Sequence, residues 1–264
     1  MRNSGFMRLL LLIVLAVGGV IAVFFLTDIG TFQLTGEETS KVFELEQYES
    51  ISFSGAGTLT LKTGNERSLR ITTDKNLLEK INVDQEGEDV TVAFERIDFV
   101  RSLKLEREDI AFELTTPNIE SLTLSGTFAL ETDGEVTSDE IILSSTGRLD
   151  GDLTIYTNNL GMSFGGQGTL TIGGTVLEET ALSASGNGTF MVEDLNTDLV
   201  TIKANGSHTI ALGSPEALQT ELNGVNKITF IETPTELSTK TQGQSTVQLK
   251  SLTPEESEET PIEE

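Results

Sequence analysis

LSASGNGTFMVEDL, residues 182–195, shows the pattern on which this chain is built. Its centre is a Ser-Gly-Asn-Gly turn, and the alternation that follows places Phe190 and Val192 on the inner side of a strand. A phosphate-binding loop would carry a lysine and lead into a helix, whereas this stretch has no lysine and runs into a strand. We therefore interpret the glycines as structural, because glycine allows positive φ at a turn, where Ser and Asn can bond to the local backbone.

Related stretches recur along the chain, and each has a turn followed by alternating apolar residues, as in 162-MSFGGQGTLTI-172. From Gly126 onward the aligned turns are spaced by 18 to 21 residues. The aligned positions are Gly55, Gly126, Ser145, Gly166, Gly186, Gly206, Gly224 and Gly243, and the predicted structural turn residues further include Gly57, Gly147, Gly168 and Gly188.

A sustained period near twenty residues is typical of a solenoid. Each unit has short strands and no helical periodicity, which predicts an all-β parallel β-helix of about 20 residues per coil. One coil cannot bury its own apolar face, so the coils must stack. Two other folds are alternatives: a leucine-rich repeat, suggested by Ile119, Leu122 and Leu124, and an antiparallel β-sandwich. The leucine pattern is not held in later units, and a sandwich would not require a constant period.

Residues 42–121 differ from the later units and are predicted to form the first coil and an N-terminal cap. A cap would cover the open end of the stack, which otherwise exposes unpaired strand edges. Asp74 is predicted to cap a short helix over residues 74–81. Strands are expected at 69–73, 90–94 and 109–117, a turn at 84–89, and a loop or edge at 101–109. Residues 122–250 are then the remaining β-helix coils.

An apolar run of 18 residues, 9–26, precedes this body. As a helix it would be about 27 Å long, close to the thickness of the hydrocarbon core of a bilayer. Basic residues precede the run and acidic residues follow it, which predicts a transmembrane signal anchor with the short basic segment 1–8 in the cytoplasm and the linker 27–41 outside. A cleaved signal peptide and a buried core helix are the alternatives. Residues 251–264 are rich in Glu and are predicted to be a disordered acidic tail.

Residues 42 to about 250 resemble the head GIN domain family, which is described as auto-transporter adhesins. The resemblance rests on 51-ISFSGAGTLTL-61, on 74-DKNLLEKI-81, on 115-TTPNIESLTLSG-126 and on the repeated S-G-x-G turns. It implies a right-handed parallel β-helix in a bacterial cell-envelope protein, and it implies no known activity. The later units depart from the pattern, since they read N-G-S, N-G-V and Q-G-Q.

Composition excludes several kinds of chemistry. The formal net charge of −25 opposes nucleic-acid binding, which needs a basic surface. The chain has no cysteine, and its single histidine, His208, is predicted to lie in an exposed turn. No catalytic residue, metal site or cofactor is therefore predicted.

Acidic pairs occur at several predicted turns and are interpreted as solvated charges: Asp150 and Asp152, Glu178 and Glu179, and Glu193 and Asp194. Weak binding of Ca²⁺ through carboxylate oxygens is one alternative. A pair of carboxylates that hydrolyses a glycosidic bond is the other.

These observations predict a membrane-anchored envelope protein, in the periplasm or at the cell surface, whose β-helix is a surface for binding, adhesion or interaction. Solenoid faces are extended, and envelope polysaccharide or a partner protein are the expected ligands. The alternative is a carbohydrate-active enzyme, a polysaccharide hydrolase or lyase, which rests on analogy between folds alone.

Overall fold

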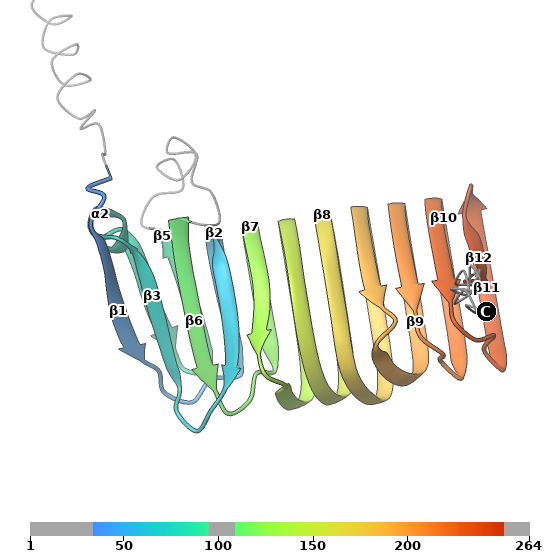
Figure 1. Ribbon diagram of the computed structural model, residues 1–264, viewed down its shortest axis with the longest axis horizontal. Coiled ribbons are helices and arrows are strands. Elements are labelled where there is room, and N and C mark those ends of the chain that lie inside the picture. Colours follow the sequence, from blue (N-terminus) through green and yellow to red (C-terminus); the bar gives the residue numbers. More distant parts are fainter. Residues whose placement is uncertain (1–33, 95–108, 251–264) are drawn as a thin grey trace, which may run out of the picture. The chain divides into compact units, whose positions relative to one another are not determined.

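Strands that carry the repeated glycines lie side by side and parallel in the computed structural model, which describes residues 34–94 and 109–250 (Figure 1). Gly55 pairs with Gly126, Gly126 with Gly147, and Gly186 with Gly206, so each coil lies directly on the one before. The strands that build the coils are β2 (Ser50–Thr63), β7 (Ser121–Asp133), β8 (Val136–Val192), β9 (Leu195–Leu212), β10 (Ala217–Phe230), β11 (Glu236–Gly243) and β12 (Thr246–Leu249). The predicted all-β solenoid is confirmed.

The repeated glycine lies at a corner where a strand bends without leaving the ladder. Gly186 has φ of 104°, and a β carbon there would lie 2.3 Å from the carbonyl oxygen of Gly166 in the preceding coil. Both observations require glycine, because a side chain is strained at this φ and has no space. A β carbon would lie 1.8–2.5 Å from the carbonyl oxygen of the previous coil's glycine at all of the following positions: Gly126, Gly147, Gly166, Gly186, Gly206, Gly224 and Gly243. Positive φ is found at each of these except Gly166, and also at Gly55.

One aligned position in the sequence was wrong by two residues. Gly147, and not Ser145, lies opposite Gly126, while Ser145 pairs with Leu124 and is buried. Side chains alternate across a strand with a period of two, so a shift of two residues keeps every apolar residue on its predicted side. The pattern of apolar residues therefore could not reveal the error.

The second glycine of the S-G-x-G motif has a different role from the first. Gly57 and Gly188 lie at inward positions without positive φ, and the absent side chain leaves space for a phenylalanine ring. A β carbon at Gly57 would lie 2.4 Å from Cε2 of Phe112, and one at Gly188 would lie 3.1 Å from Cε2 of Phe190. Gly168 differs from both, since it has φ of 149° and approaches the backbone of the preceding coil.

Apolar side chains fill the space between the sheets of the solenoid. Phe190 and Val192 are buried, which confirms their predicted inward orientation. Phe164 and Phe190 pack edge to face, with ring centroids 5.1 Å apart, and so join two successive coils. Phe53 packs edge to face on Phe112 with centroids 5.2 Å apart, and this contact joins the first coil to the cap.

The N-terminal cap begins with a coil that is formed by two separate strands. Both β5 (Asp89–Phe94) and β6 (Ile110–Thr116) pair in parallel with β2, β5 before the corner at Gly55 and β6 after it. Antiparallel strands then cover these two: β4 (Ile81–Glu86) pairs with β5, while β3 (Ser68–Asp74) pairs with β6 and with β1 (Glu38–Glu44). The outermost strand of this end is β1 (Figure 1).

The cap confirms most of the local predictions. Asp74 is the N-cap of helix α2 (Lys75–Leu78), and its side chain accepts a hydrogen bond from the backbone N–H of Asn76. The helix is shorter than predicted because β4 begins at Ile81. Gly87 has φ of 64° in the turn between β4 and β5. The first cap strand, β1, begins at Glu38, inside the segment predicted as a linker.

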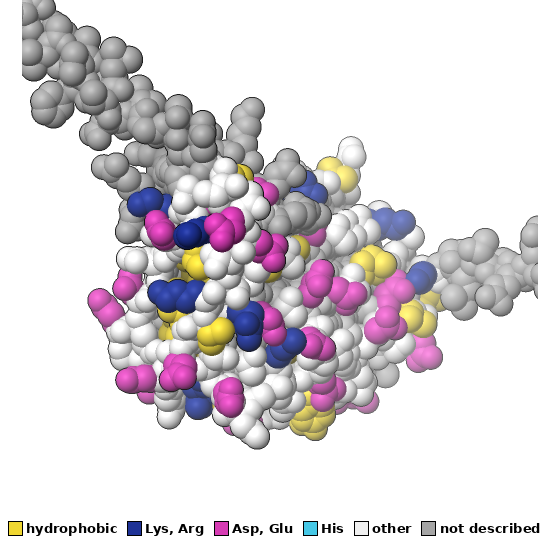
Figure 2. All heavy atoms as spheres, turned by 60° about the vertical axis from the view of Figure 1, so that its left-hand side comes forward, with side chains coloured by type: hydrophobic (Ala, Val, Ile, Leu, Met, Phe, Trp, Pro, Cys, Tyr) yellow, Lys and Arg dark blue, Asp and Glu magenta, His cyan; other side chains and the backbone are white. Residues whose placement is uncertain are grey.

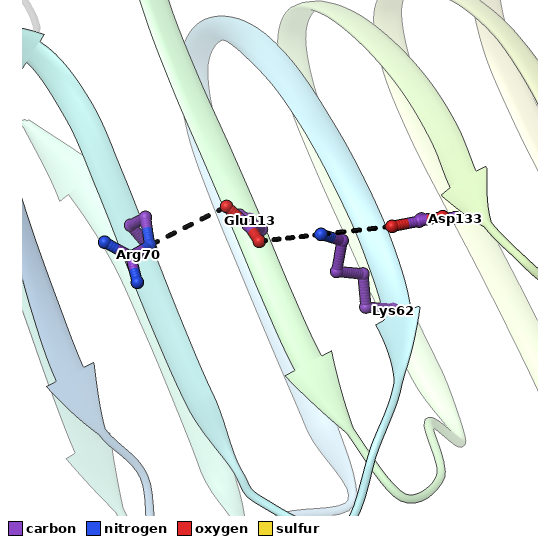
Figure 3. Close-up of polar contacts among 4 residues, drawn as sticks. All are labelled: Lys62, Arg70, Glu113 and Asp133. Carbon is purple, nitrogen blue, oxygen red and sulfur yellow. Dashed lines mark hydrogen bonds and ion pairs between the residues drawn. The ribbon is translucent and has the colours of Figure 1, made fainter.

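A row of ion pairs crosses the junction between the cap and the first coils (Figure 3). Nζ of Lys62 lies 2.9 Å from Oε1 of Glu113 and 3.0 Å from Oδ2 of Asp133, and Nε of Arg70 lies 3.7 Å from Oε2 of Glu113. The four residues come from β2, β3, β6 and β7. The hydrogen bond to Glu113, and then that to Asp133, raises the pKa of Lys62. Figure 2, which brings this end forward, shows acidic and basic side chains interspersed over it.

Several predictions fall outside the described residues. These are the basic segment and the membrane helix in residues 1–26, the loop or edge at 101–108, and the acidic tail at 251–264. Within residues 34–94 and 109–250, no helix has the length and apolar character needed to cross a membrane.

Candidate functional site

An open groove crosses the solenoid on the face formed by the residues before each corner. Its larger part has a volume of about 450 Å³ and lies over β8 and β9. Gly161 and Ala181 leave the floor low, and Ser163, Ser183 and Thr201 place hydroxyl groups along it. A second hollow of about 100 Å³ shares Thr201 and Lys203 with the first and extends to β10 and β11. The two hollows together make one groove across several coils, with apolar residues such as Ile142 in its larger part over β8 and with hydroxyl, amide and charged groups toward β10 and β11.

The register of the parallel strands explains why the groove is continuous. Thr201 lies opposite Gln219, which lies opposite Ser238, so these side chains form one outward row. The adjacent outward row contains Lys203, Glu221 and Lys240. Neighbouring strands are about 4.8 Å apart, so each row offers a polar group at that interval. The groove thus presents regularly spaced hydrogen-bonding groups to anything that lies along it.

Charge alternates along the second of these rows. Lys203, Glu221 and Lys240 are all exposed and follow one another as positive, negative and positive groups. Opposite charges on directly neighbouring strands stabilise a sheet. The two ammonium groups also give this part of a strongly acidic chain a local site for a carboxylate, and Glu221 can accept hydrogen bonds from hydroxyl groups.

The predicted acidic pairs do not gather at one place. Oδ2 of Asp150 lies 3.0 Å from Nε of Arg148, and Oε1 of Glu179 accepts a 2.8 Å hydrogen bond from Thr201. Glu193 pairs with Lys250 at 2.6 Å, on the last described coil. In the part of the chain that the structure describes, no group of three or more His, Cys, Asp or Glu side chains is arranged to hold a metal ion.

His208 is buried, and its predicted position in an exposed turn is wrong. Its side chain is 2 % exposed and lies between Gly188 of one coil and Asn226 of the next. Its Nδ1 lies 2.9 Å from Oδ1 of Asn226. The residue lies two positions after a corner glycine, and this position points inward in every coil. Phe128 and Leu149 occupy it in earlier coils, so the aligned sequence contained the signal.

The groove residues were not predicted from the sequence, although the sequence contains a signal for them. Lys203, Glu221 and Lys240 each stand three residues before the corner glycine of their coil, and Ser163 and Ser183 hold the same position in earlier coils. Only the stacking of coils shows that these side chains form one row.

Residues 47–255 match the family described as "Putative auto-transporter adhesin, head GIN domain". This match covers most of the 264 residues. The chain belongs to the head GIN domain family. The resemblance seen in the sequence is thereby confirmed.

Solved structures show the same solenoid for other proteins. A "putative adhesin" from Bacteroides fragilis is similar with a TM-score of 0.71 and 17 % identity, over 83 % of this chain and 100 % of the other. A second "putative adhesin", from Parabacteroides merdae, has a TM-score of 0.55 and 18 % identity over 82 % and 98 % of the two chains. A "putative lipid binding protein" from Parabacteroides distasonis has a TM-score of 0.55 and 14 % identity over the same shares.

At these identities, the likeness shows that this head GIN domain shares a fold with them. No curated protein matches the chain. The family description is consistent with a role in adhesion or binding at the cell envelope or outside the cell.

Proposed function

We propose that this head GIN domain protein binds a polysaccharide of the bacterial envelope along this groove. The observation that carries the proposal is the pair of outward rows that crosses β9 to β11, with hydroxyl and amide groups in one row and Lys203, Glu221 and Lys240 in the other. An extended polymer of sugars needs hydrogen-bonding groups at regular intervals along its length. Parallel coils supply them because every coil repeats the same position.

Charge narrows the class of polysaccharide. The ammonium groups of Lys203 and Lys240 can bind the carboxylates of an acidic sugar, whereas the chain as a whole, with a net charge of −25, repels polyanions. The groove therefore favours a polymer with spaced carboxylates over a densely charged one. A partner protein that binds the same groove is the other outcome that the experiment below detects.

We further propose that residues 9–26 anchor the protein in the cytoplasmic membrane with the solenoid outside, and that the β-helix is right-handed. The anchor rests on the length of the apolar run and on the basic residues before it. The topology has a direct test in spheroplasts. Protease added outside should digest the solenoid, and protection of residues 42–250 would overturn the proposed topology.

The binding proposal is tested with the full chain and two polysaccharides, one neutral and one containing uronic acids. Ser183→Trp places a bulky ring on the floor of the groove and should weaken binding by about tenfold or more. Thr209→Trp adds the same ring at an exposed position after the corner of the next coil, outside the groove, and should not change binding. Retention of the native melting temperature by both variants makes the comparison valid.

Two results would contradict the proposal. In the first, the native chain binds neither polysaccharide but captures an envelope protein, and Ser183→Trp abolishes this capture. The other is equal binding by Ser183→Trp and Thr209→Trp, which would place the ligand away from the groove. Lys203→Ala should reduce binding of the acidic polymer more than binding of the neutral one.

A further inference from the structure

The last strand of the solenoid has an edge that pairs with no other strand of the described residues. At the N-terminal end, antiparallel strands cover the first coil, but at the C-terminal end the order of strands stops at β11. All eight residues of β11 are exposed, and among them Leu237 is 48 % exposed. Leu249 in β12 is 51 % exposed. Strand edges of this kind pair readily with another chain, and proteins usually protect them.

The backbone of β11 shows which of its groups face this edge. The N–H of Glu236 donates to the carbonyl oxygen of Glu216, the residue just before β10, and that of Gln244 donates to the carbonyl oxygen of Gly224 in β10. Even-numbered residues of the strand therefore bond toward β10. In a strand the direction alternates, so the N–H and C=O groups of Leu237, Thr239 and Thr241 point toward the open edge.

Charge favours a second copy of the same strand as the occupant of this edge. The row of Lys203, Glu221 and Lys240 alternates in sign and ends on Lys240, with no acidic residue beyond it on the described residues. Residues 236–250 carry one Glu and two Lys, a net charge of +1, in a chain whose total is −25. Residues 236–250 by themselves therefore do not repel a second copy of the strand, although six Glu follow them in residues 251–264.

We propose that two copies of this protein join end to end through antiparallel pairing of β11 about a two-fold axis at Ser238. In this register Leu237 lies opposite Thr239 of the other copy, and both present edge-facing backbone groups, as an antiparallel hydrogen-bonded pair requires. Glu236 then lies opposite Lys240 of the other copy, and the reverse pair forms by symmetry. These are non-hydrogen-bonded pairs, in which side chains approach most closely.

Two further consequences follow from this register. The partner's Glu236 continues the alternating row of charges, so the groove of one copy continues into that of the other. The exposed Leu237 and Leu249 at the end of the core lie at the junction, where the second copy shields them from water. The pairing is independent of what the groove binds.

Cysteine cross-linking of the full chain tests the proposal, since the chain has no cysteine of its own. Ser238→Cys places two thiols opposite one another at the axis, where a non-hydrogen-bonded pair has Cα atoms about 4.5 Å apart, within the range of a disulfide. We expect a disulfide-linked dimer on mild oxidation. Ser40→Cys, on the exposed strand β1 at the other end, is the control and should form no disulfide-linked dimer, even if the apolar segment 9–26 associates.

Charge reversal makes the test specific for the register. Adding Lys240→Glu to Ser238→Cys places two Glu side chains opposite each other and should reduce the dimer to the level of the Ser40→Cys control. Adding both Glu236→Lys and Lys240→Glu restores opposite charges and should restore the dimer. A Ser238→Cys chain that stays monomeric overturns the proposal and indicates that another segment covers β11. If adding Lys240→Glu does not reduce cross-linking, the proposed register is wrong, and the proposal is overturned.

Discussion

A hydrogen bond of 2.9 Å joins Nδ1 of His208 to Oδ1 of Asn226 inside the solenoid. The amide nitrogen of Asn226 donates to the carbonyl oxygen of Asn223 at 3.1 Å, so the amide oxygen is turned toward the histidine. Nδ1 of His208 is therefore the donor and carries the proton. The two side chains come from successive coils, and their bond replaces the apolar contacts made by Phe128 and Leu149 at the same position of earlier coils.

Asn226→Ala should lower the free energy of unfolding by about 1–3 kcal/mol, because it leaves the buried Nδ1–H of His208 without its acceptor. Chemical denaturation of the full chain measures the change. Asn223→Ala is the control, since its side chain is exposed and its backbone carbonyl group is retained. If the native chain and Asn226→Ala unfold at the same denaturant concentration, the pair of His208 and Asn226 contributes nothing to stability.

Gly186→Ala should destabilise the protein more than Gly87→Ala. Both glycines have positive φ, which costs a residue other than glycine about 1–3 kcal/mol. At Gly186 the new β carbon also meets the carbonyl oxygen of Gly166 at 2.3 Å, whereas at Gly87 it meets no atom within 4 Å. The difference between the two melting temperatures thus isolates the cost of close stacking. Similar melting temperatures would show that the coils separate at little cost.

Gly57→Ala should be more destabilising than Gly188→Ala. The new methyl group would lie 2.4 Å from the ring of Phe112 and 3.0 Å from the carbonyl oxygen of Ile110, whereas at Gly188 the nearest ring atom is 3.1 Å away. Overpacking of a filled core costs about 1–3 kcal/mol. Thermal unfolding of the two variants checks the order. The reverse order would contradict the assignment of Gly57 as a space for the ring.

Glu49→Gln should raise the melting temperature at neutral pH. The charge of Glu88, and then that of Glu120, raises the pKa of Glu49, so the folded chain binds a proton there more tightly than the unfolded chain does. Ionisation of Glu49 therefore destabilises the fold as the pH rises through the carboxyl range, and protonation removes this effect as the pH falls. The benefit of Glu49→Gln should disappear at a pH below about 4.

Glu79→Gln is the control for the change of net charge, since Glu79 is exposed at the end of α2. Added salt should reduce the effect of Glu49→Gln, because it screens exposed charges. An effect of Glu49→Gln that is the same at every pH would exclude repulsion as its cause.

Local features of the chain were predictable because they depend on neighbours in sequence. Asp74 caps α2 as expected because an Asp side chain accepts a hydrogen bond from the N–H two residues later. Phe190 and Val192 point inward because the strand alternates with a period of two. The spacing of the glycines predicted the stacked coils, because every coil needs a glycine at the corresponding corner.

Features that depend on contacts between coils were not predictable from one sequence. Ser145 and Gly147 both fit the alternation, and only the pairing with β7 decides between them. The inward position of His208 could be read from the aligned coils, but its partner Asn226 lies one coil away and follows only from the pairing of β9 with β10. Glu113 lies 51 residues from Lys62 along the chain, and the folding of β6 onto β2 brings them within 2.9 Å.

By itself, the sequence determined the all-β class, the period of the coils and the family, because each follows from a pattern that repeats along the chain. The tertiary structure decided the register of the coils, the hydrogen-bond partner of His208 and the continuity of the groove. A side chain in a solenoid has its decisive neighbours one coil away, and a shift of two residues in the stacking changes those neighbours while leaving the pattern of apolar and polar residues unaltered.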